Sequence, residues 1–138
     1  MRIIPTGIHA VMDYLLGIIL VGTPFVLGFA PGFAAEDALV DPWATYLMVA
    51  LGFALIVYSL LTDYELSLVA LIPVRVHLVL DGLSGALLVV SPWLFGFVSF
   101  VFLPHVVLGA IEILAALLTD PRPYRNRRRA ARGVDARR

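Results

Sequence analysis

The chain contains the same apolar segment twice, and this repeat constrains its fold more than any other feature. Residues 4–29 match residues 72–97 at 12 of 26 positions, 68 residues apart. Further along the chain, residues 48–63 match residues 105–120 at a separation of 57. An internal repeat of this kind predicts two similar structural units in tandem.

The repeated segments have the composition of membrane-spanning helices. The chain is 61% hydrophobic and 14% charged, with a mean hydropathy of +0.96, whereas a soluble domain is about half apolar and about a quarter charged. Helices of ~20 apolar residues cross a bilayer, and continuous apolar runs favour helices over the alternating strands of a barrel. Four windows have this length and are nearly free of charge: residues 7–28, 43–62, 74–96 and 100–119.

The sequence therefore predicts an all-α integral membrane four-helix bundle, built from two tandem two-helix repeats. Residues 1–65 are expected to form the first transmembrane hairpin and residues 66–120 the second. Residues 121–138 are expected to form a disordered basic tail, because this segment is rich in charge and poor in apolar side chains. The 138 residues leave no room for a soluble catalytic domain.

Arginine is concentrated at the C-terminal end of the chain. Residues 121–138 contain eight of the ten basic residues, whereas the 30–42 loop contains acidic residues and no basic one. The positive-inside rule predicts a multi-pass protein of the bacterial inner membrane with both termini in the cytoplasm. Because the tail follows a span directly, anionic lipid headgroups are its expected partner, and nucleic acid is not. The expected lipid-binding residues are Arg125, Arg127, Arg128 and Arg129.

Proline, glycine and aromatic residues mark the predicted helix ends. Pro5 and Pro73 stand where a helix begins, which costs no hydrogen bond. Pro24 and Pro92, followed by Gly28 and Gly96, predict a kink or an end near the outer interface. Aromatic belts are expected at both interfaces. The outer belt contains Trp43, Tyr46, Trp93, Phe95, Phe97, Phe100 and Phe102, and the inner belt contains Tyr58, Tyr64 and Tyr124.

Residues 91–97 read Ser-Pro-Trp-Leu-Phe-Gly-Phe, and the first copy has Thr-Pro-Phe at residues 23–25. This segment resembles the signature of the SPW-repeat family of small bacterial membrane proteins, over about residues 4–120. The resemblance implies two transmembrane helices in each repeat, with Ser-Pro-Trp in the first helix, and implies no activity. The signature positions are Pro24, Gly28, Ser91, Pro92, Trp93 and Gly96.

Ionisable residues inside the predicted spans are the chemical leads. His9 and Asp13 are four residues apart and share a helix face, and His77 and Asp81 repeat the pair. At 1.5 Å per residue, both Asp residues and Glu112 lie about 10 Å from the cytoplasmic end of their helices. Each span has a small or polar face, which we expect to point into the bundle.

The His–Asp pairs allow several interpretations. Interhelical hydrogen bonds that fix how the hairpins meet are favoured, with no metal or cofactor, because polar pairs commonly join membrane helices. A proton or ion pathway through the Asp, His and Glu residues is the second interpretation. A transition-metal site is the third, and haem ligation by His9 and His77 is the fourth.

The sequence points to a structural or accessory component of a membrane assembly and not to an enzyme. It lacks a phosphate-binding loop and an HExxH motif. The expected partners are the lipid bilayer and either a larger membrane complex or a second copy of the chain. The alternative is a small transporter or channel that uses intramembrane Asp13, Asp81 and Glu112, with His9 and His77.

Overall fold

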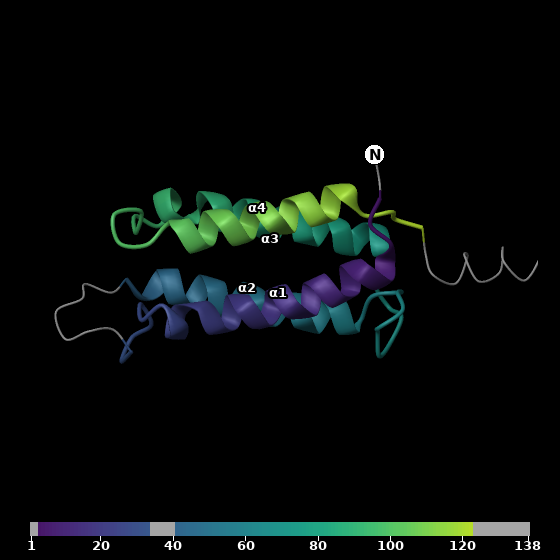
Figure 1. Ribbon diagram of the computed structural model, residues 1–138, viewed down its shortest axis with the longest axis horizontal. Coiled ribbons are helices and arrows are strands. Elements are labelled where there is room, and N and C mark those ends of the chain that lie inside the picture. The colour runs from purple at the N-terminus through teal and green to yellow at the C-terminus, as the bar shows by residue number, and fades with distance from the viewer. Residues whose placement is uncertain (1–2, 34–40, 123–138) are drawn as a thin grey trace, which may run out of the picture.

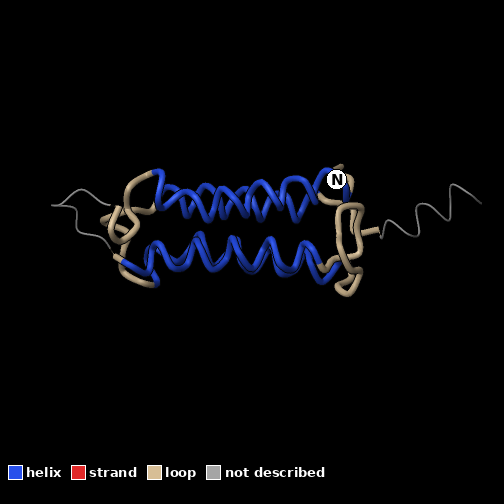
Figure 2. The backbone as a smooth tube through the Cα atoms, turned by 90° about the horizontal axis from the view of Figure 1, so that it is seen from below, coloured by secondary structure: helices blue, strands red, loops and turns tan. Residues whose placement is uncertain are grey.

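The computed structural model describes residues 3–33 and 41–122 and contains four helices. In chain order these are α1 (Thr6–Val26), α2 (Pro42–Leu60), α3 (Val74–Leu94) and α4 (Leu103–Leu118). The α1–α2 hairpin forms one layer of the bundle and the α3–α4 hairpin forms the other (Figure 1). Figure 2, turned by 90°, shows the helices running alongside one another between loops at both ends. The predicted all-α four-helix architecture is confirmed.

The helices α1 and α3 begin and end where the positions of proline and glycine in the sequence predict. Pro5 is the N-cap of α1, and Pro73 is the N-cap of α3. Pro24 and Pro92 lie in the last turns of these helices, and Gly28 and Gly96 follow with φ of 72° and 79°. The left-handed conformation is accessible to glycine without a steric penalty, so it turns the chain sharply away from the helix axis.

Three of the four helices are long and apolar enough to cross a membrane: α1, α2 and α3, with 21, 19 and 21 residues. The fourth, α4, has 16 residues and a length of about 24 Å, so it is shorter than the expected window at 100–119. Residues 95–102 form the turn before it, and Pro104 occupies the first turn of α4, where a missing N–H costs nothing.

Within each hairpin the two helices touch through glycine. A Cβ atom placed on Gly17 would lie 3.0 Å from the carbonyl oxygen of Gly52. In the second hairpin, a Cβ on Gly85 would lie 2.7 Å from the carbonyl oxygen of Gly109. The backbones approach to contact at equivalent places in both repeats, as small residues permit in membrane helices.

Short extended segments at one end join the hairpins to each other. Ile4 pairs with residues 118–120 through amide–carbonyl bonds of 3.0 and 3.0 Å, and Ile72 pairs with residues 61–63 through bonds of 2.8 and 2.9 Å. In each case the end of one repeat binds the start of the other. The Ile-Pro and Leu-Leu-Thr-Asp motifs, which recur in both copies, therefore close the bundle at this end.

The small and polar faces point into the bundle, as predicted. In α2 the buried face includes Met48, Leu55 and Ser59, and in α4 it includes His105 and Glu112. Apolar side chains cover much of the outer surface, as expected for contact with lipid. The repeats differ in their outer connections, which span residues 27–41 in the first hairpin and 95–102 in the second.

Candidate functional site

The two His–Asp pairs meet at the centre of the bundle, near the end that carries the N-terminus. His9 and Asp13 come from α1, and His77 and Asp81 come from α3. In each helix the two side chains lie one turn apart on the buried face. One nitrogen or oxygen atom from each of the four side chains lies within 4.8 Å of the other three. We call these residues the His–Asp cluster.

Each histidine contacts both aspartates, and its shorter contact is with the other repeat. His9 Nε2 lies 3.1 Å from Asp81 Oδ2 and 3.5 Å from Asp13 Oδ2. His77 Nε2 lies 2.9 Å from Asp13 Oδ2 and 3.2 Å from Asp81 Oδ2. The side chains are no more than 5% exposed. The cluster therefore bridges the hairpins in a setting where charge–charge attraction is strong.

Thr62 fixes the orientation of one imidazole ring. Its hydroxyl donates to the carbonyl oxygen of Tyr58 at 2.7 Å and lies 2.8 Å from His77 Nδ1. A hydroxyl has one hydrogen, so at His77 it accepts, and Nδ1 must carry a proton. The Nε2 atom of His77 is thereby directed at the carboxylates. In the described part of the chain, Nδ1 of His9 has no hydrogen-bond partner.

Two tyrosines complete the surroundings of the carboxylates. The Tyr58 hydroxyl donates to Asp81 Oδ1 at 2.7 Å, and the Tyr64 hydroxyl donates to Asp13 Oδ2 at 3.3 Å. Burial and the charge of Asp13 raise the pKa of the Tyr64 phenol above its ordinary value, so Tyr64 stays a donor. Both residues were expected in the inner aromatic belt. Their hydrogen-bond partners were not predicted, because the depth of a residue in the membrane does not reveal which way its phenol group points.

Glu112 lies outside the four-residue cluster. It is buried in α4 and accepts a hydrogen bond from the Ser84 hydroxyl of α3. The Ser84 hydroxyl oxygen also lies 3.0 Å from the carbonyl oxygen of Leu80 and 3.2 Å from that of Asp81. The second carboxylate oxygen of Glu112, Oε2, has no partner among the described residues. Ser84 is three residues from Asp81 in α3, but it approaches the backbone of Asp81 and not its carboxylate, so Glu112 stands beside the cluster without a side-chain hydrogen bond to it among the described residues.

His105 lies at the other end of the bundle, in the first turn of α4. Its Nε2 atom is 3.0 Å from the carbonyl oxygen of Ala44, and its ring packs against Phe97 with centroids 4.8 Å apart. Phe97 lies at the outer level where it was expected, but it is fully buried and packs inside the bundle instead of facing the interface. Trp43 and Trp93, by contrast, are more than half exposed, as expected for that belt.

The Ser-Pro-Trp signature also lies at this far end. Proline cannot donate a backbone hydrogen bond, so Pro92 leaves the carbonyl oxygen of Leu88 without its helical partner. The Ser91 hydroxyl donates to that oxygen at 2.7 Å. Trp93 projects to the surface and lies beside Phe102, with ring centroids 6.4 Å apart. The signature shapes the end of α3 and contributes nothing to the His–Asp cluster.

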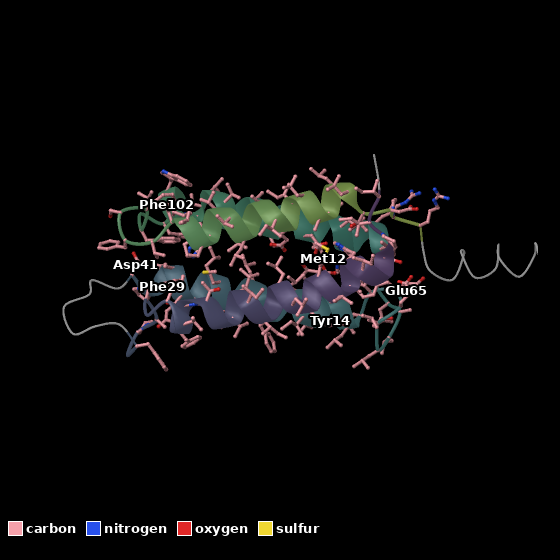
Figure 3. All side chains as sticks on the ribbon, in the orientation of Figure 1. Met12, Tyr14, Phe29, Asp41, Glu65 and Phe102 are labelled. Atoms are coloured by element: carbon pink, nitrogen blue, oxygen red, sulfur yellow. The ribbon has the colours of Figure 1, made fainter. Side chains whose placement is uncertain are left out.

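The loop from 61 to 73 covers the first hairpin near the cluster. Tyr14 donates to the carbonyl oxygen of Leu66 at 2.9 Å, and the Thr6 hydroxyl donates to Glu65 at 2.7 Å. Tyr14 and Glu65 lie at the same end of the bundle, opposite the end that carries Asp41 and Phe29 (Figure 3). The predicted lipid-binding residues Arg125, Arg127, Arg128 and Arg129 lie outside the described residues.

Comparison with protein families identifies the repeat. The model of the SPW repeat domain matches residues 7–119, which include all four helices except the first residue of α1. The chain belongs to the SPW repeat family. No curated protein and no solved structure matches it.

Membership in the SPW repeat family and the three long apolar helices agree that this is a small membrane protein. The family match includes the His–Asp cluster as well as the Ser-Pro-Trp segment. The resemblance read from residues 91–97 is therefore confirmed over both repeats.

Proposed function

We propose that this SPW repeat protein is a non-enzymatic structural or accessory component of a membrane assembly, in which the His–Asp cluster clamps the two hairpins together. The observation that carries the proposal is the crossing of contacts between repeats. His9 of the first hairpin is closest to Asp81 of the second, and His77 of the second is closest to Asp13 of the first.

The outer surface supports an assembly role. Large apolar side chains on all four helices are exposed, including Ile18, Phe53, Leu83 and Leu117, so lipid or a partner helix can cover them. The partner is either a larger membrane complex or a second copy of the chain. Native mass spectrometry of protein extracted in lipid nanodiscs should give a defined stoichiometric assembly. A single copy as the main species would contradict the assembly role.

The proposed location is the bacterial inner membrane, with both termini in the cytoplasm. The chain contains no cysteine, so single-cysteine variants can be made without altering other positions. An impermeant thiol reagent added to whole cells should label Asp37→Cys and leave Arg132→Cys unlabelled. Labelling at 132 but not at 37 would reverse the orientation.

A proton or ion pathway is the second candidate, and Glu112 is the observation that favours it. In the described part of the chain, Glu112 is buried, one of its carboxylate oxygens has no hydrogen-bond partner and the other accepts from Ser84 of α3. Ionisable residues inside membrane spans often mark such routes. Proteoliposomes containing the purified chain should show no proton flux above that of empty vesicles. The transport role would be supported, and the structural role contradicted, by proton flux that Glu112→Gln abolishes. Asp41→Asn, at the opposite end, should leave that flux unchanged.

A further inference from the structure

The His–Asp cluster has the dimensions of a metal coordination shell. Its four His-to-Asp separations are 2.9, 3.1, 3.2 and 3.5 Å, and the two remaining separations are within 4.8 Å. Four ligands that surround Zn²⁺ tetrahedrally at its usual bond lengths lie about 3.3–3.5 Å apart. Small movements of buried side chains therefore bring all four atoms to bonding distance from one central ion.

The hydrogen bonds around the cluster orient it for a cation. The Thr62 hydroxyl oxygen accepts a hydrogen bond from Nδ1 of His77. The Nε2 atom of His77 is therefore the one that faces the carboxylates. Tyr58 and Tyr64 each donate to a carboxylate of the cluster. Outer hydrogen bonds of this kind fix the ring tautomer and the carboxylate orientation at metal sites. A clamp made only of ion pairs needs no particular tautomer, because both nitrogens of an imidazolium carry protons.

Charge balance makes a cation and two protons interchangeable. With both histidines protonated and both aspartates ionised, the cluster has no net charge. A divalent cation bound by two neutral histidines and two aspartates has no net charge either. Starting from that doubly protonated form, binding exchanges one M²⁺ for two H⁺, which leave from the Nε2 atoms of His9 and His77. The exchange places no additional net charge in the low-dielectric interior.

We propose that the cluster binds one divalent first-row transition-metal ion through Nε2 of His9 and His77 and the carboxylates of Asp13 and Asp81. A mixed set of imidazole and carboxylate ligands suits Zn²⁺ and its neighbours in that row better than Mg²⁺ or Ca²⁺. This inference rests on the proposed structural role, because the ion replaces two protons within the same clamp. It revises the expectation from sequence, which favoured hydrogen bonds without metal.

The test is elemental analysis of protein purified in detergent, loaded with Zn²⁺ and then freed of unbound metal. One ion per chain is expected in the wild type and in the control His105→Ala, which removes a buried histidine outside the cluster. None is expected in His9→Ala/His77→Ala. Absence of metal from the wild type, or its retention in the double variant, would overturn the proposal.

A second variant covers the case in which the double histidine variant does not fold. Asp13→Asn/Asp81→Asn keeps side-chain shape and hydrogen-bonding capacity but removes both carboxylates, so the helical protein should lose the metal. Loading with Co²⁺ should produce the visible absorption of a four-coordinate nitrogen–oxygen site in the wild type. An octahedral spectrum identical to that of the double variant would overturn the proposal.

Failure of the metal site is distinguishable from failure of the clamp. If Asp81→Leu destabilises the protein but the wild type binds no metal, the clamp stands and the metal proposal falls. A different outcome separates the site from the clamp. If the wild type binds metal, but neither removal of the metal by a chelator nor Asp81→Leu changes the unfolding midpoint, the site exists without the structural role. Zn²⁺ binding should also release protons into weakly buffered solution, and binding without release would refute the exchange.

Discussion

In the first hairpin, Tyr14 of α1 donates to the carbonyl oxygen of Leu66, whereas the second hairpin has Gly82 at the equivalent position. A Cβ atom on Gly82 would meet nothing within 4 Å. A cavity of about 440 Å³ lies there instead, lined by Arg75, Leu78, Val79, Gly82, Ile113, Ala116, Leu117 and Pro121. The outer surfaces of the two repeats have therefore diverged.

The inner surfaces have diverged less. His, Asp and Gly recur on the buried faces of α1 and α3, and a threonine ends each hairpin at positions 62 and 119. Several inner positions differ: Tyr58 corresponds to Ala115, Leu55 to Glu112, Met48 to His105, Ser59 to Ala116 and Thr6 to Val74. The recurring His, Asp, Gly and Thr positions form a shared framework that joins the hairpins. The positions that differ lie around this framework, and each is specific to one repeat. Substitutions at framework positions should act alike in both repeats.

The largest effect is expected from Asp81→Leu. The change leaves two histidines with one carboxylate, and breaking a buried ion pair in this way costs about 3 kcal/mol. Asp13→Leu should lower the free energy of unfolding by a similar amount, and Asp81→Asn by less, because the amide still forms hydrogen bonds. Unfolding by SDS, followed by circular dichroism, measures all three. A large effect at one aspartate and none at the other would refute the equivalence of the repeats.

Gly85→Ala should rank next, because its Cβ would meet the backbone carbonyl of Gly109 at 2.7 Å and force α3 and α4 apart. We expect a loss of about 2 kcal/mol, typical of overpacking. Gly17→Ala should behave alike in the first hairpin. Gly82→Ala is the matched control, and its effect should stay within about 1 kcal/mol, since alanine favours helix and nothing obstructs it. Tolerance of alanine at both contact glycines would contradict the close crossing.

Tyr58→Phe tests the asymmetric surroundings of the cluster. It removes the hydroxyl that donates to Asp81 at 2.7 Å, and loss of such a bond costs about 1 kcal/mol. Tyr46→Phe, at an exposed position in the same helix, should leave the unfolding midpoint unchanged. Equal effects of the two substitutions would mean that the hydroxyl of Tyr58 contributes nothing to the stability of the clamp.

Truncation after Tyr124 should have the smallest effect. The tail has no counterpart in the first hairpin, whose end continues into the loop from 61 to 73. Because the sequence after Tyr124 is rich in charge and poor in apolar side chains, we expect its removal to change the free energy of unfolding by less than about 0.5 kcal/mol. The same truncation should weaken binding to vesicles that contain anionic lipid, by about 1 kcal/mol for each arginine lost near the surface. A large loss of thermal stability in detergent would show that the tail packs on the bundle.

Much of the fold was predictable because membrane helices must satisfy their own backbone and bury their polar faces. The repeated Pro and Gly positions predicted the ends of α1 and α3. The four-residue spacing of His9 and Asp13 predicted that their side chains lie on the same face of the helix. The start of α4 was less predictable, because the apolar residues before Leu103 suit a turn at the interface as well as a helix.

The meeting of the two His–Asp pairs followed from the repeat, but their partners did not. The hydrogen bonds that join Thr62 to His77 and Tyr64 to Asp13 depend on the path of the loop after α2, which hydropathy does not encode. The recurrence of Leu-Leu-Thr-Asp in both copies was the signal that could have identified Thr62. Tyr58 lacks such a signal, since its counterpart is alanine.

The central claim is that the His–Asp cluster joins the two repeats, and a double-mutant cycle between His9→Ala and Asp81→Ala tests it most directly. These residues belong to different hairpins and lie 3.1 Å apart. Measured in metal-free protein, the free energies of unfolding should show a coupling of about 1–2 kcal/mol, within the range for residues in contact. Additive effects of the two substitutions would contradict the clamp.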